Sequence, residues 1–282
     1  MKVFILTDLE GPSGVNGRSD GIGNTMVNRP TAEEALVREV NACCEGLIAA
    51  GADEIVVLDG HGGSNSIDIF KLHPAASLLQ LGGQQPVCWI DSSYDAMVMI
   101  GAHCMHSALG HMSHSYNSHG TARLMLNDRE IGEIGLGARM AAYFGVPLIM
   151  VSGDQTACRE AEQEIGPEVV TVQVKEALSR YTAINYSPGK VQQLLRDAAE
   201  NALRKLQEVP LLAMEDHYKL TKRFMCPNQA FPLEMTGGKR VDECTVEFES
   251  DDLIDLVAQS HGWAAGVHNR KYGISPEWVF CG

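Results

Sequence analysis

Short apolar runs alternate with amphipathic helical patterns along the first two-thirds of the chain. Residues 2–8 and 54–59 are typical of buried strands, and residues 36–48 between them carry apolar side chains at helical spacing. A capping-box pattern, Thr31 three residues before Glu34, precedes this helix and a glycine follows it, which supports both of its ends. A strand, a helix and a second strand in this order predict a βαβ unit built on a parallel sheet.

The same alternation continues further along the chain. Strands are predicted at residues 97–101, 122–126 and 147–151, and helices over residues 130–144 and 155–165. Several strands that alternate with helices predict an α/β fold, with an open, mostly parallel sheet wrapped by helices on both faces.

The pattern changes after residue 185. A long amphipathic helix begins at Ser187-Pro188, and residues 244–249 alternate between apolar and polar side chains as a half-buried strand does. We therefore expect two domains, a larger α/β domain over residues 1–185 and a smaller C-terminal α+β domain over residues 186–282.

Composition and charge narrow the class of protein. Of the 282 residues, 45% are hydrophobic and 21% are charged, which is ordinary for a globular protein with a sizeable core. No apolar run reaches the ~20 residues of a membrane-spanning helix, and the first apolar run meets an acidic residue too early for a signal peptide. The net charge of −14 argues against nucleic acid or an anionic membrane as a partner.

The cysteines indicate a reducing compartment. Eight cysteines are scattered without a C-x-x-C pair, in a chain too long to need disulfides for its stability. We expect reduced, mostly buried thiols and a cytoplasmic protein.

Acidic residues and histidines follow three of the predicted strands. Asp8 and Glu10 come after the first strand, Asp59 and His61 after the second, and His103 after the strand at residues 97–101. Because ligands of an open α/β sheet bind outside the carboxyl ends of the strands, we expect these side chains at one rim. An aspartate in such a place is often only a turn former, whereas Glu10 is a poor turn residue. Two histidines with carboxylates suit zinc or another first-row divalent ion.

Residues 101–120 form a loop with an unusual density of histidine. Five of the ten histidines lie there, among serines and glycines, and a loop that follows a strand is where function concentrates. Five are more nitrogen ligands than even a two-metal site needs. Glu133 lies at the start of the next helix, where the helix dipole favours an acid whether or not it binds a metal. We interpret His73 as a surface or packing histidine.

Taken together, the motifs of the first 165 residues resemble the zinc-dependent D-aminopeptidase family, bacterial enzymes associated with dipeptide-transport operons. The shared motifs, in order along the chain, are Asp8-Leu9-Glu10-Gly11, Asp59-Gly60-His61, Gly101-Ala102-His103, Met112-Ser113-His114-Ser115, Asn127-Asp128, Gly132-Glu133-Ile134-Gly135-Leu136 and Val151-Ser152-Gly153-Asp154. Each motif is weak alone, but the set keeps the family's order and approximate spacing. The last third of the chain shows a looser similarity.

The resemblance implies a centre of two Zn²⁺ ions per chain. Asp8 would bridge both ions, Glu10 and His61 would complete one site, and His103 and Glu133 would complete the other. Two divalent ions ~3.5–4 Å apart share a water and lower its pKa toward neutrality, which suits the hydrolysis of an amide. The same ligands also accept Mn²⁺ or Co²⁺.

The resemblance further implies the reaction and its catalytic residue. Family members release amino-terminal D-residues from short peptides with a free amino terminus, and they are ring-shaped homo-oligomers, with a decamer as one candidate. The resemblance implies that His114 is the catalytic residue, as nucleophile or base. An imidazole with an unperturbed pKa near 6.5 could take or give a proton at physiological pH, which is compatible with that role. Residues 1–185 would then be the catalytic, metal-binding domain, and residues 186–282 would add a pocket wall and contacts between copies.

Three other functions remain open on the residues alone. The same ligands would serve another metal-dependent amidohydrolase, in which only the pocket differs. A metal-free cysteine hydrolase would use Cys104 as its nucleophile, with Asp8 or a neighbouring histidine as base. A non-catalytic metal-binding module would need only the ligands, whereas an adjacent, unliganded His114 favours catalysis.

Four polar residues in or near these motifs are neither proposed ligands nor the proposed catalytic residue. His106, His111 and His119 match no motif of the family. Asp154 ends a predicted strand, where it would either cap its own helix, which is the role we expect, or orient a metal ligand.

Overall fold

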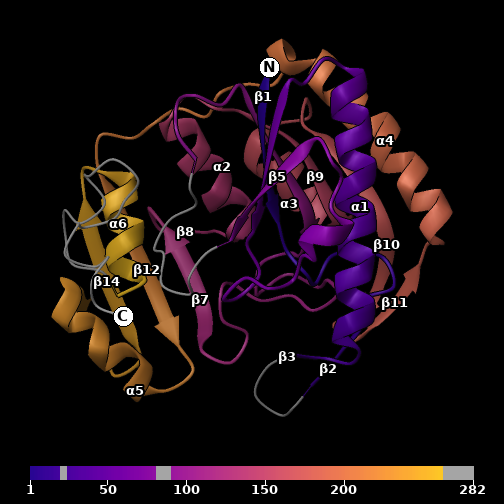
Figure 1. The fold of residues 1–282 in the computed structure, drawn as a ribbon. Helices are drawn as coiled ribbons and strands as arrows, with labels where there is room; N and C mark the ends of the chain where they lie inside the picture. The colour runs from indigo at the N-terminus through magenta and orange to yellow at the C-terminus, as the bar shows by residue number, and fades with distance from the viewer. Residues whose placement is uncertain (20–23, 81–89, 263–282) are drawn as a thin grey trace.

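The computed structural model describes residues 1–19, 24–80 and 90–262, and its centre is a seven-stranded sheet (Figure 1). The strands lie in the order β11-β10-β9-β6-β1-β4-β5. Their bounds are β1 (Lys2–Thr7), β4 (Glu54–Asp59), β5 (Ala76–Gln80), β6 (Ala96–Ala102), β9 (Leu148–Asp154), β10 (Val170–Ser179) and β11 (Thr182–Asn185). All neighbours are parallel except β11, which pairs antiparallel with β10 at one edge. The predicted α/β sheet is therefore confirmed.

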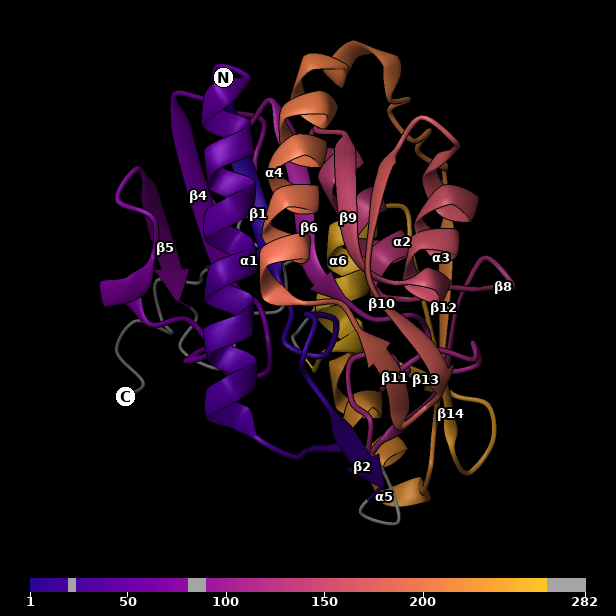
Figure 2. The ribbon, with the colours of Figure 1, turned by 90° about the vertical axis from the view of Figure 1, so that its right-hand side faces the viewer.

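Helices cover both faces of this sheet. On one face, α1 (Arg29–Ala49) packs against α4 (Pro188–Arg204), and on the other α2 (Glu133–Tyr143) packs against α3 (Gln155–Ile165) (Figures 1 and 2). Right-handed crossovers explain this arrangement. The chain moves through α1 toward one edge of the sheet and through α2 and α3 toward the other, so the helices fall on opposite faces.

A second, antiparallel sheet of five strands packs beside α2, in the order β13-β14-β12-β7-β8. Its strands are β7 (Thr121–Leu126), β8 (Arg129–Glu130), β12 (Tyr218–Phe224), β13 (Lys239–Arg240) and β14 (Thr245–Ser250). Helix α6 (Leu253–Ser260) lies against β12 and β14. The remaining short elements are β2 (Gly17–Ser19), β3 (Asn24–Met26), α5 (Pro227–Ala230) and three 3-10 turns at Ile69–Lys71, Leu206–Glu208 and Phe231–Thr236.

The two sheets interleave along the chain. Strands β7 and β8 belong to the second sheet although they precede residue 185, whereas α4 follows that residue and packs on α1 of the first layer. The division between the sheets therefore does not fall at residue 185. Residues 122–126 do form a strand, as predicted, but an apolar run of this length carries no information about which sheet it joins.

Two helix starts differ from the sequence-based expectation. The helix expected from residue 130 begins at Glu133, because Arg129 and Glu130 pair with β7. The capping box expected at Thr31 does not form: α1 already begins at Arg29, and the Thr31 hydroxyl accepts a hydrogen bond from the Asn28 side chain at 2.6 Å.

Like β9, the central strand β6 is buried at every residue. A central parallel strand with helices on both faces has no solvated side, which is why its sequence is a continuous apolar run. The larger hydrophobic core surrounds this strand, and a smaller one lies between α2, the second sheet and α6. Within the described ranges, no helix is long and apolar enough to cross a membrane.

Gly46 allows α1 and α4 to pack closely. A Cβ at this position would lie 2.1 Å from the carbonyl oxygen of Arg196 and 2.9 Å from the Cβ of Ala199, both in α4. Because the first of these atoms belongs to the backbone, α4 would have to move as a whole. At Gly189, near the start of α4, a Cβ would have no other atom within 4 Å.

We expect Gly46→Ala to destabilise the protein although alanine is the better helix former. Relief of the glycine penalty gains about 1 kcal/mol, whereas overpacking costs about 1–3 kcal/mol. Gly189→Ala is the matched control and should be neutral or stabilising by up to about 1 kcal/mol. Urea unfolding of the two variants measures the difference, and equal stability would contradict the close packing.

Candidate metal centre

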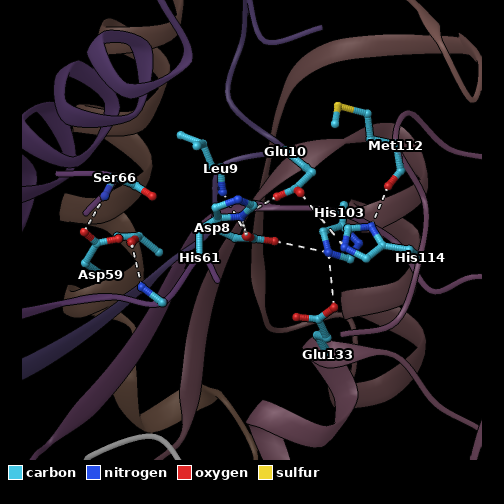
Figure 3. A network of polar contacts seen from close by, with 12 residues as sticks. Asp8, Leu9, Glu10, Asp59, His61, Ser66, His103, Met112, His114 and Glu133 are labelled. Carbon is cyan, nitrogen blue, oxygen red and sulfur yellow. Dashed lines mark hydrogen bonds and ion pairs between the residues drawn. The ribbon is translucent and has the colours of Figure 1, made fainter. Parts of the chain in front are cut away.

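The five candidate ligands meet at the carboxyl end of the parallel sheet (Figure 3). Strand β1 lies between β4 and β6, so the residue that follows β1 falls between the residues that follow its two neighbours. Asp8 directly follows β1, His61 comes two residues after β4, and His103 directly follows β6. Glu10 lies in the loop after β1, and Glu133 is the first residue of α2. The rim predicted from the strand ends is therefore formed.

A glycine lets the loops after β1 and β6 come together at this rim. The amide of Asp8 donates to the carbonyl of Ile100 at 2.9 Å, and the amide of Gly11 donates to the carbonyl of Gly101 at 2.8 Å. Gly101 has a φ of 80°, and a Cβ there would lie 2.2 Å from the carbonyl oxygen of Asp8. Only glycine meets both conditions, the left-handed backbone and the missing side chain.

Asp8 faces a histidine on each side. Its Oδ1 lies 3.0 Å from His61 Nδ1, and its Oδ2 lies 3.2 Å from His103 Nε2. The same His61 nitrogen lies 3.0 Å from Glu10 Oε2, and the same His103 nitrogen lies 3.2 Å from Glu133 Oε1. The five residues thus form two sets that share Asp8, which is the grouping that the resemblance implied.

Backbone carbonyls orient the two buried histidine rings. His103 Nδ1 lies 3.0 Å from the carbonyl oxygen of Cys104, and His114 Nδ1 lies 2.8 Å from the carbonyl oxygen of Met112. A carbonyl only accepts hydrogen bonds, so Nδ1 carries a proton in both rings, and in the neutral ring Nε2 keeps the lone pair. The lone pair of His103 therefore points at the carboxylates, as it does in ligating histidines.

His114 lies beside the five residues, and its ring nitrogen and the ligand atoms of His103 and Glu133 all lie within 4.8 Å of one another. Its ring stacks on that of His103, with the ring centres 3.9 Å apart and the planes at 15°. Its Nε2 lies 4.0 Å from Glu10 Oε1. Burial and the neighbouring His103 lower the pKa of His114, which favours the neutral, proton-accepting form.

The electrostatics of the centre favour positive charge. Burial alone would raise the pKa of Asp8, but hydrogen bonds from His103 and His61 outweigh it and hold that pKa well below its ordinary value. Burial alone would lower the pKa of His61, yet Asp8 and Glu10 raise it to about 10. The positive charge of protonated imidazoles therefore neutralises the carboxylates here, as the charge of bound divalent cations would.

One buried oxygen of the centre has no hydrogen bond. Glu10 Oε2 accepts none, because the His61 nitrogen that lies 3.0 Å away makes its hydrogen bond to Asp8. Its charge is met by the ion pair with that His61 nitrogen and not by a hydrogen bond of its own. A carboxylate oxygen left in this state fits a bound cation.

Asp59 does not join the centre, although it belongs to one of the shared motifs. Its side chain is fully buried and points away from the other carboxylates (Figure 3). Its Oδ2 accepts hydrogen bonds from the amides of Ser66 at 2.7 Å and Ile67 at 3.0 Å. Asp59 therefore holds the loop that carries His61.

Asp154 caps its own helix, as expected. Its Oδ1 accepts the amides of Thr156 and Ala157, both at 2.8 Å, in the first turn of α3. Its Oδ2 accepts the amide of His111 at 2.6 Å. Asp154 thus also ties the histidine-rich loop to α3.

The other unassigned histidines make local contacts outside the two ligand sets. The amide of His106 donates to the hydroxyl of Ser115 at 3.2 Å, and His119 Nδ1 lies 3.0 Å from the hydroxyl of Ser118. None of these contacts involves a carboxylate of the centre.

A cavity of about 660 Å³ opens onto the centre. Ligand sites of small molecules have volumes in this range. Its apolar lining includes Met26, Met99, Met112 and Met140. His261, which follows α6, also lines it, so the helix that packs on the second sheet reaches the wall of the cavity.

Two residues near the centre were not predicted from the sequence. The amide of Tyr116 donates to Glu133 Oε1 at 2.6 Å, and the Tyr116 ring contacts the His261 ring at 4.7 Å between centres. A backbone amide leaves no signal in a sequence, and His261 is more than 100 residues from any motif of the centre. Only the packing of the second sheet on α2 brings it to the cavity.

Cys104 is unsuited to act as a nucleophile. It is fully buried, and burial raises the pKa of its thiol to about 12. The thiolate is the nucleophilic form of cysteine, and it is scarce at neutral pH when the pKa is this high. The geometry therefore gives no support to a metal-free cysteine hydrolase.

Comparison with known proteins agrees with this geometry. Residues 1–260 match the model of a peptidase family described as D-aminopeptidase. The chain is 32% identical over 260 residues to the D-aminopeptidase of Bacillus subtilis (strain 168), a match that covers 90% of this chain and 93% of that protein. The solved structure of the Zn-dependent D-aminopeptidase DppA from Bacillus subtilis, described as a self-compartmentalizing protease, matches with a TM-score of 0.84 at 31% identity, over 92% of this chain and 95% of that one. The chain thus belongs to the D-aminopeptidase family and is a peptide hydrolase of the metal-dependent type.

Proposed function

We propose that this protein is an aminopeptidase that removes an amino-terminal D-residue from short peptides through a centre of two zinc ions. The observation that carries the proposal is the position of Asp8, which faces a different histidine with each carboxylate oxygen. A residue so placed suits a bridge between two ions. The relatives support the metal and the substrate class, because they are a D-aminopeptidase and a Zn-dependent D-aminopeptidase.

The donor atoms fit the proposed ions. In this proposal Asp8 is the bridge, Glu10 and His61 complete one site, and His103 and Glu133 complete the other. Imidazole nitrogens and carboxylate oxygens are ligands that zinc prefers, and they also accept Mn²⁺ or Co²⁺. When bound, two such ions would polarise the scissile carbonyl and lower the pKa of a shared water.

We assign the proton transfer to His114. The carbonyl of Met112 holds Nδ1 at 2.8 Å, so Nε2 is the nitrogen that accepts a proton. In its neutral form the ring takes a proton from the attacking water and returns it to the leaving amine. The stacking of His114 on His103 keeps this nitrogen beside the ligands.

The cavity suits a short peptide with a free amino terminus. Its volume of about 660 Å³ is enough for a ligand of a few residues. The carboxylates of Asp8, Glu10 and Glu133 line one end of it, where a bound metal ion would receive the amino terminus in its neutral form.

We further propose that copies of the chain assemble into a ring-shaped homo-oligomer such as a decamer. The description of the relative as self-compartmentalizing supports an assembly. In the proposed smaller domain, residues 186–282, Met225 is 53%, Phe231 is 60% and Met235 is 85% exposed, which suits contacts between copies.

The location that we propose is the cytoplasm. Six cysteines in the described part of the chain are free thiols: Cys43, Cys44, Cys104, Cys158, Cys226 and Cys244. Free thiols persist in a reducing compartment.

The proposed activity is tested by the release of alanine from D-Ala-D-Ala and from L-Ala-L-Ala, before and after a chelator. Faster release from the D-peptide, lost on chelation and restored by zinc, is expected. Metal-dependent hydrolysis of other amides without release from D-Ala-D-Ala would support another amidohydrolase on this scaffold.

Zinc should stabilise the folded protein. Bound cations would replace the protons that now balance the carboxylates, and a ligand at about 1,000-fold above its Kd adds about 4 kcal/mol to the free energy of unfolding. Thermal unfolding with and without zinc measures this gain as a rise in Tm, which EDTA should reverse. The variant Asp8→Ala should show little rise, and an unchanged Tm of the wild type with zinc, manganese and cobalt would refute the centre.

His114→Ala should abolish turnover without loss of metal. Removal of a general base lowers kcat by ~10²–10⁴-fold, and His114 belongs to neither ligand set. Zinc content by atomic absorption and kcat on D-Ala-D-Ala separate the two effects. His217→Ala is the control, because His217 is an exposed histidine that pairs with Asp251. Full activity in His114→Ala would remove this residue from the mechanism.

A further inference from the structure

Lys175 is a buried cation in a parallel strand, where lysine is rarely found. It is 1% exposed and lies in β10. The register between β10 and β9 places Gln173 opposite Gly153 and Lys175 opposite Asp154, so β10 holds one extra residue at this point. A bulge of this kind re-aims a side chain, and here it accompanies a lysine that points inward.

The ammonium group of Lys175 joins two loops of the metal centre. Nζ donates to the carbonyl oxygens of Glu10 at 2.6 Å and Val15 at 3.4 Å, both in the loop after β1. It also lies 3.2 Å from Nδ1 of His111, in the histidine-rich loop after β6. An ammonium group has three N–H donors, and these three partners use all of them.

The ring of His111 is oriented to accept this bond. Its Nε2 lies 3.2 Å from Oδ1 of Asn16. Because an ammonium group only donates, Nδ1 is the acceptor, and Nε2 carries the proton that it donates to Asn16. His111, which no sequence motif explained, thus connects its loop to the loop of Glu10 through Lys175.

A buried carboxylate holds the same loop from helix α1. Glu39 is 3% exposed, and its Oε1 accepts the amide of Ser13 at 2.7 Å. Burial raises the pKa of this carboxyl group to about 8, and the charge of Lys175 opposes that rise. The loop after β1 is therefore fixed at three backbone points, which are Glu10, Ser13 and Val15.

We propose that Lys175 is a positioning residue of the metal centre. It fixes the backbone of the Glu10 loop against the histidine-rich loop, and thereby aims the Glu10 carboxylate at its metal ion and holds it 4.0 Å from His114. An apolar replacement leaves two buried carbonyls without their donor, so the loop shifts to find others. The proposal rests on the assignment of Glu10 as a metal ligand.

The test compares Lys175→Met with Val172→Ala. Methionine keeps the length of the side chain without its donors, and Val172→Ala removes only apolar core contacts from the same strand. Two quantities are measured: zinc affinity, by competition with a chromophoric chelator, and amide hydrogen exchange of the metal-free protein. Lys175→Met should bind zinc ~10–100-fold more weakly, as is typical when a partner of a metal ligand is lost, and exchange faster over residues 8–16. Val172→Ala should match the wild type in both.

The proposal would be overturned if Lys175→Met bound zinc as tightly as the wild type does. It would also be overturned if Val172→Ala lost as much zinc affinity as Lys175→Met. If Lys175→Met does not fold, His111→Ala removes one of the three bonds and should give a smaller loss of affinity. Unchanged affinity and exchange in that variant would likewise overturn it. If the wild-type protein binds no metal, the proposed function is contradicted instead. Amide hydrogen exchange of the metal-free protein would still show whether Lys175 holds the loop.

Discussion

The order of three neighbouring strands, β6-β1-β4, is the constraint on which the centre depends. Parallel strands lie about 4.8 Å apart and end at the same edge, so a side chain after the middle strand lies between side chains from both neighbours. Asp8 occupies that middle place, with His61 on one side and His103 on the other. A single carboxylate can therefore be shared by two sets of candidate ligands, and no flexible loop has to bring the sets together.

Each loop of this rim is held by a buried polar group that does not itself belong to the ligand sets. Asp59 holds the loop of His61, Asp154 holds the histidine-rich loop, and Lys175 with Glu39 holds the loop of Glu10. Buried charges are costly unless they are paired or hydrogen-bonded, so such anchors are expected where geometry must be maintained. The precision of the centre thus rests on polar contacts in the core beneath it.

The fold and the place where the candidate ligands meet were largely predictable, because both depend on periodicity and on strand ends. Residues 2–8 and 54–59 show buried strands, and polar residues directly after them mark the rim. The strand at residues 122–126 was predicted but not its sheet, since local pattern does not encode long-range pairing. The part played by Lys175 was not predictable either. A lysine in an apolar strand is a visible anomaly, but its partners are up to 165 residues away in sequence.

Anomalous diffraction at the zinc edge, on crystals of the protein grown with zinc, would test the central claim most directly. We expect two peaks per chain, ~3.5–4 Å apart, on either side of the Asp8 carboxylate. One peak should contact Glu10 and His61, and the other His103 and Glu133. A single peak, or two peaks that do not share Asp8, would contradict the account.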